Sequence, residues 1–376
     1  MTPAMIDSAY RLHPPISEDS TQVGSVATMD QEGAVQFDPP HRPTIDDVAK
    51  LAEVHKGTVS RALDARKRHQ VARETIEKVE RAAREIGYVP NVLARGLRTR
   101  SSMTIGVVLP DITNPFFPPI IRGIESYVNP RGYTSLLVNT DSDAAVERTA
   151  LNSLIDRRVD GLIVASGQRD ETALTDLYRS GIKVVLLNRD AGSVPYPLVG
   201  GDDAGGVKAA VEHLVGLGHR NILHVAGPIN FSTSLKRAEA FSAACAMHPE
   251  VTSRVITADS LSTAAGERIM KRDIERGSGP TAVVAGNDLI ALGVLRALRT
   301  HGLRCPHDVS VVGFNDMPFA EDFSPPLTTV HVPTEAMGKR AAELILEAIH
   351  TGSLDQQTVL LPVSLVVRES TAPPSR

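Results

Sequence analysis

From residue 101 onward, short apolar runs alternate regularly with stretches that carry apolar residues at helical spacing. The apolar runs predict eight strands, at Thr104–Leu109, Ser135–Asn139, Gly161–Ala165, Val184–Asn188, Ile222–Ala226, Val255–Thr257, Ala282–Ala285 and Val309–Phe314. The other stretches predict eight helices, around residues 117–130, 144–158, 171–180, 204–217, 234–247, 263–276, 288–301 and 334–350. Continuously apolar strands that alternate with helices are typical of parallel sheets covered on both faces, so we expect an α/β fold.

Sixteen elements are more than one sheet comfortably holds, so residues 101–376 are expected to form two lobes, each a doubly wound parallel sheet. The first lobe is expected at about 101–200 and 331–355, and the second at about 201–328 and 358–370. The chain would then cross between the lobes near 199–203, 327–333 and 352–358.

Residues 41–90 predict a separate, small helical domain. Thr44 is the expected N-cap of a first short helix, and a break at residues 53–55 precedes a second helix over Lys56–Leu63. A third helix, over Val71–Gly87, carries an apolar stripe that would cover the first two. Two short helices joined by about three residues have the proportions of a helix-turn-helix, whose second helix enters the major groove of DNA.

Charge supports a role in DNA binding. Residues 41–100 hold 14 Lys and Arg against 8 Asp and Glu, although the whole chain has a net charge of −4. The second helix begins with short or cationic residues: His55, Lys56, Gly57, Thr58, Ser60 and Arg61. Lys56 and Arg61 can donate to guanine edges or phosphates, and the hydroxyl groups suit phosphates. A three-helix protein-interaction module with a basic face stays an alternative.

The stretch TIDDVAKLAEVHKGTVSRAL, followed by YVPNVLARGLRTR, resembles the lactose-repressor (LacI/GalR) family of transcriptional regulators. The resemblance covers about residues 42–370 and implies a periplasmic-binding-protein-like body behind the helix-turn-helix head. It implies phosphate contacts at Thr44, Thr58, Ser60 and Asn91, and base contacts at Lys56, Gly57 and Arg61. It also implies a hinge helix over 91–100, with Ala94 and Leu97 in the minor groove and Arg95 attracted to phosphate.

The head departs from the family at three positions. Glu53 occupies the tight turn, where glycine is usual, and His55 replaces the usual serine cap of the second helix. Gly57 has no side chain with which to read a base. These departures leave the operator sequence open.

Polar and aromatic side chains follow several predicted strands, where ligands bind in doubly wound sheets. Paired donors and acceptors beside aromatic faces suit a neutral, polyhydroxylated ligand. The resemblance implies an effector site made of Phe116, Phe117, Asn188, Thr233, Arg237, Asn287 and Asn315. Ser260 stands where an aromatic residue is usual, Val332 where a polar one is common, and Leu235 where a polar or basic one is frequent. We therefore expect a smaller, differently oriented or more weakly bound ligand.

The expected function is that of a sequence-specific DNA-binding regulator, a repressor, controlled by a small polar effector such as a sugar derivative. It would bind a roughly palindromic double-stranded operator as a homodimer. The alternatives are a regulator with a vestigial or non-sugar site, a DNA-binding architectural protein, and a sugar-binding receptor without a DNA role. The last alternative is disfavoured by the basic head.

Other functional classes lack their sequence signals. We find no phosphate-binding, dinucleotide-binding, nucleophile-elbow or zinc-protease motif, so we expect no enzyme activity, cofactor or metal. Residues 1–40 show no signal-peptide pattern and are expected to be a disordered extension, with Met29 as an alternative start. No apolar run is long enough to span a membrane, and a cytoplasmic location is expected.

Overall fold

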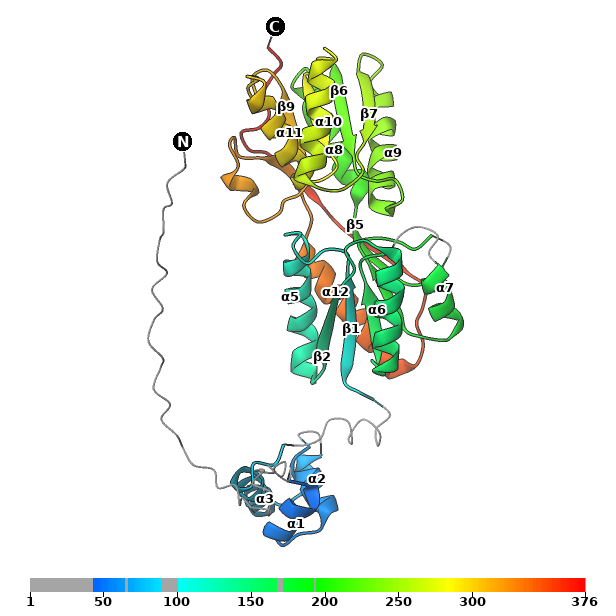
Figure 1. The fold of residues 1–376 in the computed structure, drawn as a ribbon, viewed down its shortest axis with the longest axis vertical. Helices are drawn as coiled ribbons and strands as arrows, with labels where there is room; N and C mark the ends of the chain where they lie inside the picture. The colour runs from blue at the N-terminus through cyan, green and yellow to red at the C-terminus, as the bar shows by residue number, and fades with distance from the viewer. Residues whose placement is uncertain (1–42, 65–66, 90–100, 168–171, 193, 376) are drawn as a thin grey trace, which may run out of the picture. The chain divides into compact units, whose positions relative to one another are not determined.

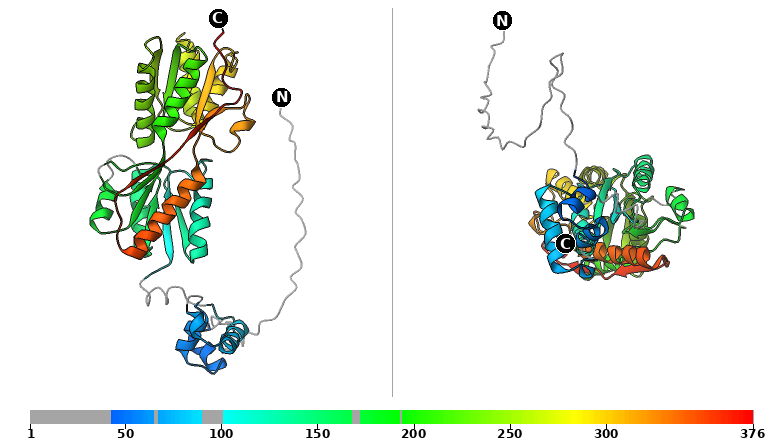
Figure 2. Two further views of the ribbon diagram at one scale, coloured as in Figure 1. Left: turned by 180° about the vertical axis from the view of Figure 1, so that it is seen from behind. Right: turned by 90° about the horizontal axis from the view of Figure 1, so that it is seen from below.

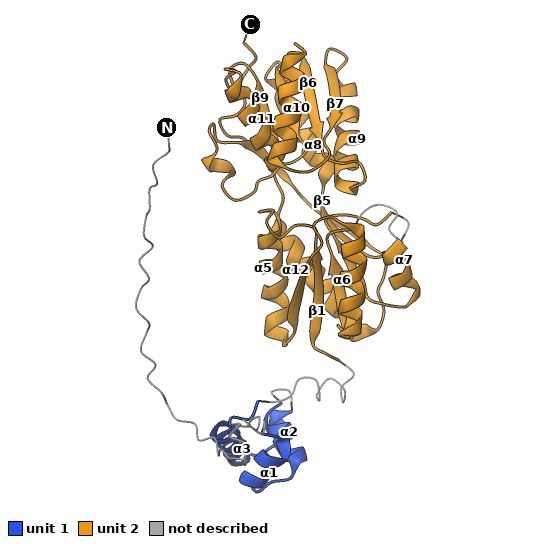
Figure 3. Ribbon diagram, viewed as in Figure 1, with its two compact units in different colours: residues 1–91 blue, residues 92–376 orange. Residues whose placement is uncertain are grey.

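The computed structural model describes residues 43–64, 67–89, 101–167, 172–192 and 194–375. The expectations for residues 1–40 and for the hinge, including Asn91, Ala94, Arg95 and Leu97, lie outside these residues. The chain divides into two compact units, residues 1–91 and residues 92–376 (Figure 3).

The first unit contains a helix-turn-helix and a third helix, as predicted. Its elements are α1 (Ile45–Leu51), α2 (Lys56–Ala62), the short 3₁₀ helix η1 (Arg68–Gln70) and α3 (Arg73–Glu85) (Figure 1). A small apolar core joins the three α-helices, with Val48 from α1, Val59 from α2 and Val79 from α3 all fully buried.

The second unit holds two six-stranded sheets, in two lobes (Figure 1). The first sheet has the order β11-β5-β4-β3-β1-β2, and the second has the order β12-β10-β9-β8-β6-β7. The strands of the first sheet are β1 (Thr104–Leu109), β2 (Thr134–Asn139), β3 (Gly161–Val164), β4 (Val184–Leu187), β5 (Leu198–Gly201) and β11 (Thr358–Leu361). Those of the second are β6 (Asn221–Ala226), β7 (Thr252–Thr257), β8 (Ala282–Ala285), β9 (Ser310–Asn315), β10 (Thr328–His331) and β12 (Ser364–Val366). Every pairing is parallel except that of β10 with β12.

Eight described α-helices flank these sheets. The helices of the first lobe are α5 (Phe117–Val128), α6 (Ala144–Asp156), α7 (Thr172–Arg179) and α12 (Thr334–Thr351). Those of the second are α8 (Asp203–Gly216), α9 (Ser232–Ala246), α10 (Thr263–Glu275) and α11 (Asp288–Thr300). Short 3₁₀ helices follow α5 and β9, at η2 (Asn129–Arg131) and η3 (Ala320–Asp322).

The chain passes between the lobes three times. It leaves the first sheet after β5, returns after β10, and crosses again between β11 and β12, where Figure 2 shows the red segment running from one lobe to the other. The expected third crossing, at 352–358, is wrong, and residues 358–361 belong to the first lobe. The reason is that β11 pairs with the open edge of β5, from Thr358 opposite Leu198 to Leu361 opposite Gly201. The apolar run from 359 to 367 is interrupted only by Pro362 and Ser364, so the sequence carries little boundary signal there.

Helices α5 and α12 pack side by side (Figure 2), as do α10 and α11 (Figure 1). The helices of each pair are in contact at glycines. A Cβ atom at Gly338 would lie 2.0 Å from the carbonyl oxygen of Ile120, and one at Gly123 would lie 2.1 Å from that of Glu335. The same reciprocal arrangement occurs in the second lobe at Gly266 and Gly293. Both lobes therefore depend on helix backbones in direct contact.

Candidate functional site

The start of α1 is built around Thr44. Its hydroxyl accepts from the backbone N–H of Asp47 at 3.4 Å, and its own backbone N–H donates to the Asp47 carboxylate at 2.8 Å. The Thr44 hydroxyl also donates to that carboxylate at 2.7 Å. Thr44, named above as a phosphate contact, is thus fully engaged as a helix cap, which is also the role that its position predicts.

The tight turn between α1 and α2 accommodates Glu53 in the left-handed region, at φ 48°. The Glu53 carboxylate lies 2.8 Å from the Lys78 ammonium on α3, and this hydrogen bond and charge lower the pKa of Glu53. The negative charge that Glu53 introduces in place of the usual glycine is therefore paired with a lysine within the head.

Helix α2 begins with His55 as its cap. The Nδ1 atom of His55 accepts from the backbone N–H of Gly57 at 3.1 Å, so a neutral ring carries its proton on Nε2. A Cβ at position 57 would lie 3.1 Å from this Nδ1 atom, so glycine leaves room for the imidazole cap.

The predicted DNA-facing residues of α2 differ in exposure. Lys56 and Arg61 are exposed, whereas Thr58 and Ser60 are half-buried. The Lys56 ammonium lies 3.7 Å from the Asp46 carboxylate, with both side chains about 60% exposed, and Arg61 Nε donates to the carbonyl of Gly57 at 3.2 Å. Lys56 keeps most of its side chain open to a partner, and Arg61 is also exposed.

In the body, a cavity of about 540 Å³ is lined by both lobes. It lies at the carboxyl ends of strands β1, β2 and β4 of the first sheet and β6 and β7 of the second. The first lobe contributes Pro110, Asp111, Thr113, Asn114, Phe117, Asp141, Ser142 and Arg189. The second lobe contributes Phe231, Asp259, Ser260, Leu261 and Ser262. We call this space the interlobe cavity.

Arg189 is the buried cation of the interlobe cavity, with 4% of its surface exposed. Its guanidinium stacks 3.7 Å above the ring of Phe231 from the other lobe, and Nη1 donates to the carbonyl of Ser166 at 3.4 Å. Its Nε atom has no hydrogen-bond partner among the described residues. Burial lowers the pKa of Arg189 to about 10, opposed by the charge of Glu147 and reinforced by that of Arg237, so the group is charged at neutral pH.

The residue after Arg189 also joins the lobes. The backbone N–H of Asp190 donates to the Ser232 hydroxyl at 2.9 Å, and the Asp190 carboxylate lies 2.6 Å from the Lys236 ammonium on α9. Neither Arg189 nor Asp190 is among the residues that the sequence resemblance implies for the effector site.

The seven residues implied for the effector site are not gathered around this cavity. Only Phe117 lines it; Phe116, also buried, packs edge-on against Phe117 at 5.3 Å. Asn188 has a left-handed backbone, φ 67°, and lines a second cavity of about 370 Å³ between β5 and α9. That second cavity is lined by Asn188, Leu198, Gly200, Gly201, Asp202, Asp203, Ala204, Lys236, Glu239, Ala240, Ala243 and Leu360.

Arg237 lines neither cavity and is held on three sides within the second lobe. Its Nε atom lies 2.7 Å from the Asp203 carboxylate, and Nη1 donates to the carbonyl of Gly286 at 2.7 Å. Its guanidinium also stacks 3.6 Å above the ring of Phe314.

The remaining three implied residues are also buried in the second lobe and line neither cavity. Asn287 caps α11 by accepting from the backbone N–H of Ile290 at 2.8 Å, and it donates to the carbonyl of Leu261 at 3.5 Å. Thr233 is the second residue of α9. Asn315 has φ 116°, and its side-chain oxygen has no hydrogen-bond partner among the described residues. An unpaired buried oxygen is an open acceptor.

No described helix has the length and apolar character needed to cross a membrane. Within the same residues, no group of three or more His, Cys, Asp or Glu side chains is placed to bind a metal ion.

Comparison with known proteins covers both units. Residues 44–91 match the family described as bacterial regulatory proteins, lacI family, and residues 211–371 match the periplasmic binding protein-like domain. The HTH-type transcriptional repressor PurR of Aliivibrio fischeri (strain MJ11) is 32% identical over 334 residues, which cover 87% of this chain and 98% of that protein.

Solved structures of similar proteins include regulators with ligands. The Lac repressor dimer bound to operator and the anti-inducer ONPF superposes with a TM-score of 0.79 at 28% identity, over 88% of this chain and 99% of that one. A complex of the transcriptional regulator CelR with cellobiose superposes with a TM-score of 0.66 at 31% identity, over 88% of this chain and all (100%) of that one.

Proposed function

The chain belongs to the lacI family of bacterial regulatory proteins, and from this premise we propose how its two units divide the work of a transcriptional regulator. The first unit binds DNA and the body responds to an effector. One pairing of features carries the proposal: a helix-turn-helix with exposed Lys56 and Arg61 stands in the same chain as an interlobe cavity of about 540 Å³. Cavities of that size hold small organic molecules.

At the DNA, Lys56 and Arg61 would contact base edges and Thr58 and Ser60 phosphates. His55 would offer its Nε2 proton to a phosphate, because its Nδ1 atom already caps α2. We extend the proposal to a hinge over 91–100, where Asn91, Ala94, Arg95 and Leu97 would meet the minor groove and its backbone. Residues 41–90 would then be the DNA-binding domain proper.

The effector that fits the interlobe cavity best is a neutral, polyhydroxylated molecule such as a sugar or sugar derivative. The lining of the cavity includes the guanidinium of Arg189 and the carboxylates of Asp111, Asp141 and Asp259, the last of which is paired with Arg268. Charges of both signs are thus present, so the lining as a whole favours neither an anion nor a cation. Hydroxyl groups can both donate to the carboxylates and accept from Arg189. The rings of Phe117 and Phe231 supply apolar faces. The CelR neighbour, solved with cellobiose, supports this ligand class.

Among the implied effector residues, only Phe117 lines the interlobe cavity and would touch the ligand. Six others would act from behind the wall of the cavity, by fixing the elements that form it: Phe116, Asn188, Thr233, Arg237, Asn287 and Asn315. Arg189 is added as a direct contact.

Control of DNA binding would follow from differential affinity. An effector that binds one interlobe arrangement more tightly shifts the chain towards it and thereby changes operator affinity. The Lac repressor neighbour was solved as a dimer on its operator, and we propose a homodimer acting as a repressor on a roughly palindromic site. The family consists of transcriptional regulators; we propose that the effector is bound without being chemically changed, and that the protein works in the cytoplasm, where the DNA is.

Thermal-shift screening of the full chain against sugars, sugar acids, nucleosides and nucleobases, cellobiose included, tests the effector site. A bound ligand at about 100 times its Kd should stabilise the body by about 2.7 kcal/mol. Arg189→Met should abolish the shift, whereas Arg131→Met, at an exposed arginine stacked on Tyr127, should keep it. An equal shift in wild type and Arg189→Met would remove Arg189 from the site, and no shift with any compound would favour a vestigial cavity.

Two substitutions in the head separate sequence reading from general affinity. Lys56→Ala should narrow the difference in affinity between specific and scrambled operators. Thr44→Ala should weaken binding to both and lower the stability of the head by about 1 kcal/mol, because the cap of α1 is lost. Thr44→Ser, which retains the cap, should behave like wild type. Fluorescence anisotropy at several salt concentrations measures both effects, and the opposite pattern would mean that the head docks differently.

A further inference from the structure

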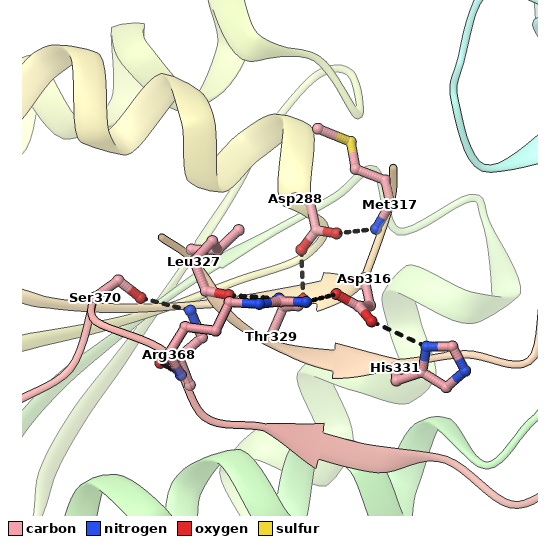
Figure 4. A network of polar contacts seen from close by, with 9 residues as sticks. Asp288, Asp316, Met317, Leu327, Thr329, His331, Arg368 and Ser370 are labelled. Carbon is pink, nitrogen blue, oxygen red and sulfur yellow. Dashed lines mark hydrogen bonds and ion pairs between the residues drawn. The ribbon is translucent and has the colours of Figure 1, made fainter. Parts of the chain in front are cut away.

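Asp288, the first residue of α11, holds a fully buried carboxylate. One of its oxygens accepts from the Thr329 hydroxyl on β10 at 2.5 Å, and the other accepts from the backbone N–H of Met317 at 2.8 Å (Figure 4). No described cation forms an ion pair with it. A buried polar group whose hydrogen bonds are all made holds the surrounding backbone in one conformation.

The carboxylate reaches this position only because β9 has a glycine there. Gly313 of β9 is paired with Thr329 of β10, and a Cβ atom at position 313 would lie 2.2 Å from the Asp288 oxygen. The Asp288 side chain therefore lies directly over a glycine–threonine pair of the sheet.

Through Met317, Asp288 fixes the turn at residues 315–317. Asn315 and Asp316 both adopt left-handed backbone conformations, at φ 116° and φ 53°. Non-glycine residues reach such conformations at a cost of about 1–3 kcal/mol each, so the surrounding contacts must hold the turn in place. The turn carries the Asn315 side chain, whose buried oxygen is an open acceptor.

The same turn is fastened on its other side by Asp316. Its carboxylate lies 2.8 Å from Arg368 Nη2 and 3.0 Å from His331 Nδ1 (Figure 4). His331 ends β10 and Arg368 follows β12, and both strands adjoin crossings between the lobes. Arg368 also donates to the carbonyl of Leu327 at 2.8 Å, which ties it to the start of β10.

We infer that Asp288 is a positioning residue of the second lobe: it holds the 315–317 turn, and Asn315 with it, while Asp316 links that turn through Arg368 and His331 to the strands that adjoin the crossings between the lobes. The inference rests on the proposed effector response of the body. The inference predicts that the stability of the 315–317 turn depends on pH.

The sign of the pH effect follows from linkage. Burial raises the pKa of Asp288 to about 7, reinforced by the charge of Asp316 and opposed by the hydrogen bonds from Thr329 and Met317 and by the charge of Arg237. The remaining charged groups around the network are Asp203, paired with Arg237, and Arg368 and His331, both paired with Asp316. A hydrated carboxyl in an opened turn would titrate near its ordinary value. Between about pH 4 and about pH 7, a rise in pH therefore increases the equilibrium constant for opening of the turn, by at most about tenfold per pH unit.

Hydrogen exchange of the full-length protein, read at the 315–317 turn and corrected for intrinsic rates, tests this without any ligand. Protection should fall several-fold or more between about pH 5.5 and about pH 7.5 in wild type. Asp288→Asn, which mimics the protonated group, should be equally protected at both values. An unchanged wild-type turn, or the same pH response in Asp288→Asn, would overturn the inference.

Two further variants test the link to the crossing strands. Arg368→Met should increase exchange in the turn and at the end of β10 together, whereas Arg304→Met, which breaks an exposed ion pair with Asp308 in the same lobe, should change neither. Loss of protection in the turn alone would contradict the link. These hydrogen-exchange results do not depend on the ligand screen. A screen without hits would count against the effector proposal, but the role of Asp288 in holding the turn would still be tested.

Discussion

Gly338→Val is expected to lower the free energy of unfolding of the body by about 3 kcal/mol or more. A Cβ atom at this position would lie 2.0 Å from the carbonyl oxygen of Ile120, 2.9 Å from its carbonyl carbon and 3.1 Å from the nitrogen of Ile124. These are backbone atoms of α5 and cannot rotate away. Helices α5 and α12 would have to separate, which would open the packed face of the first sheet.

Alanine provides the sharper form of this experiment. In a helix interior, glycine to alanine ordinarily stabilises by about 1 kcal/mol, so a destabilised Gly338→Ala would reverse the usual sign. Gly216, an exposed residue at the end of α8, has no atom within 4 Å of its would-be Cβ, so Gly216→Ala should be neutral or stabilising. Urea denaturation followed by circular dichroism measures all three variants. Equal behaviour of Gly338→Ala and Gly216→Ala would show that α5 and α12 are not in backbone contact.

Arg237→Ala is expected to destabilise the second lobe by about 3–5 kcal/mol, because it leaves the Asp203 carboxylate without its partner. The two side chains are 7% and 11% exposed and lie 2.7 Å apart. The substitution also removes the donor to the Gly286 carbonyl and the stacking on Phe314. A loss of effector response in this variant alone would therefore report unfolding as much as binding.

A double substitution separates these two effects. Arg237→Met combined with Asp203→Asn removes both charges, and replacing both members of a buried pair is often close to neutral. We expect this variant to recover most of the stability and to bind operator DNA, but to respond weakly or not at all to any effector found in the screen. Asp203→Asn alone is the matched control for the buried arginine. A normal response in the double variant would show that Arg237 has no part in ligand binding.

Most of the fold could be predicted from the sequence because the spacing of the apolar residues in each segment matches the face that is buried. The amphipathic segments gave eight helices close to their observed bounds, and Thr44 marked the start of α1. The missed strands are β5, β10, β11 and β12. They are three or four residues long, and β5 contains two glycines, so each is formed by pairing with a neighbour rather than by local preference.

The candidate site was less predictable, because it depends on which way short segments turn. In the Asn188-Arg189-Asp190 segment, the left-handed backbone of Asn188 places Arg189 at the interlobe cavity and Asn188 at the other one. No periodicity encodes that choice. Arg237 looks like a ligand-binding residue in the sequence, but its partners Asp203, Gly286 and Phe314 become neighbours only after folding.

The three crossings have a consequence for how the protein is made. Helix α12 and strand β11, which complete the first sheet, are translated only after β6 to β10, and β12, which completes the second, comes later still. Neither sheet can be completed before β11 or β12, respectively, has emerged from the ribosome. During synthesis the edge of β5 waits for a strand more than 150 residues downstream. Both lobes should thus become protease-resistant only after β11 and β12 have left the ribosome. A nascent chain stopped before β11 should contain no protease-resistant lobe.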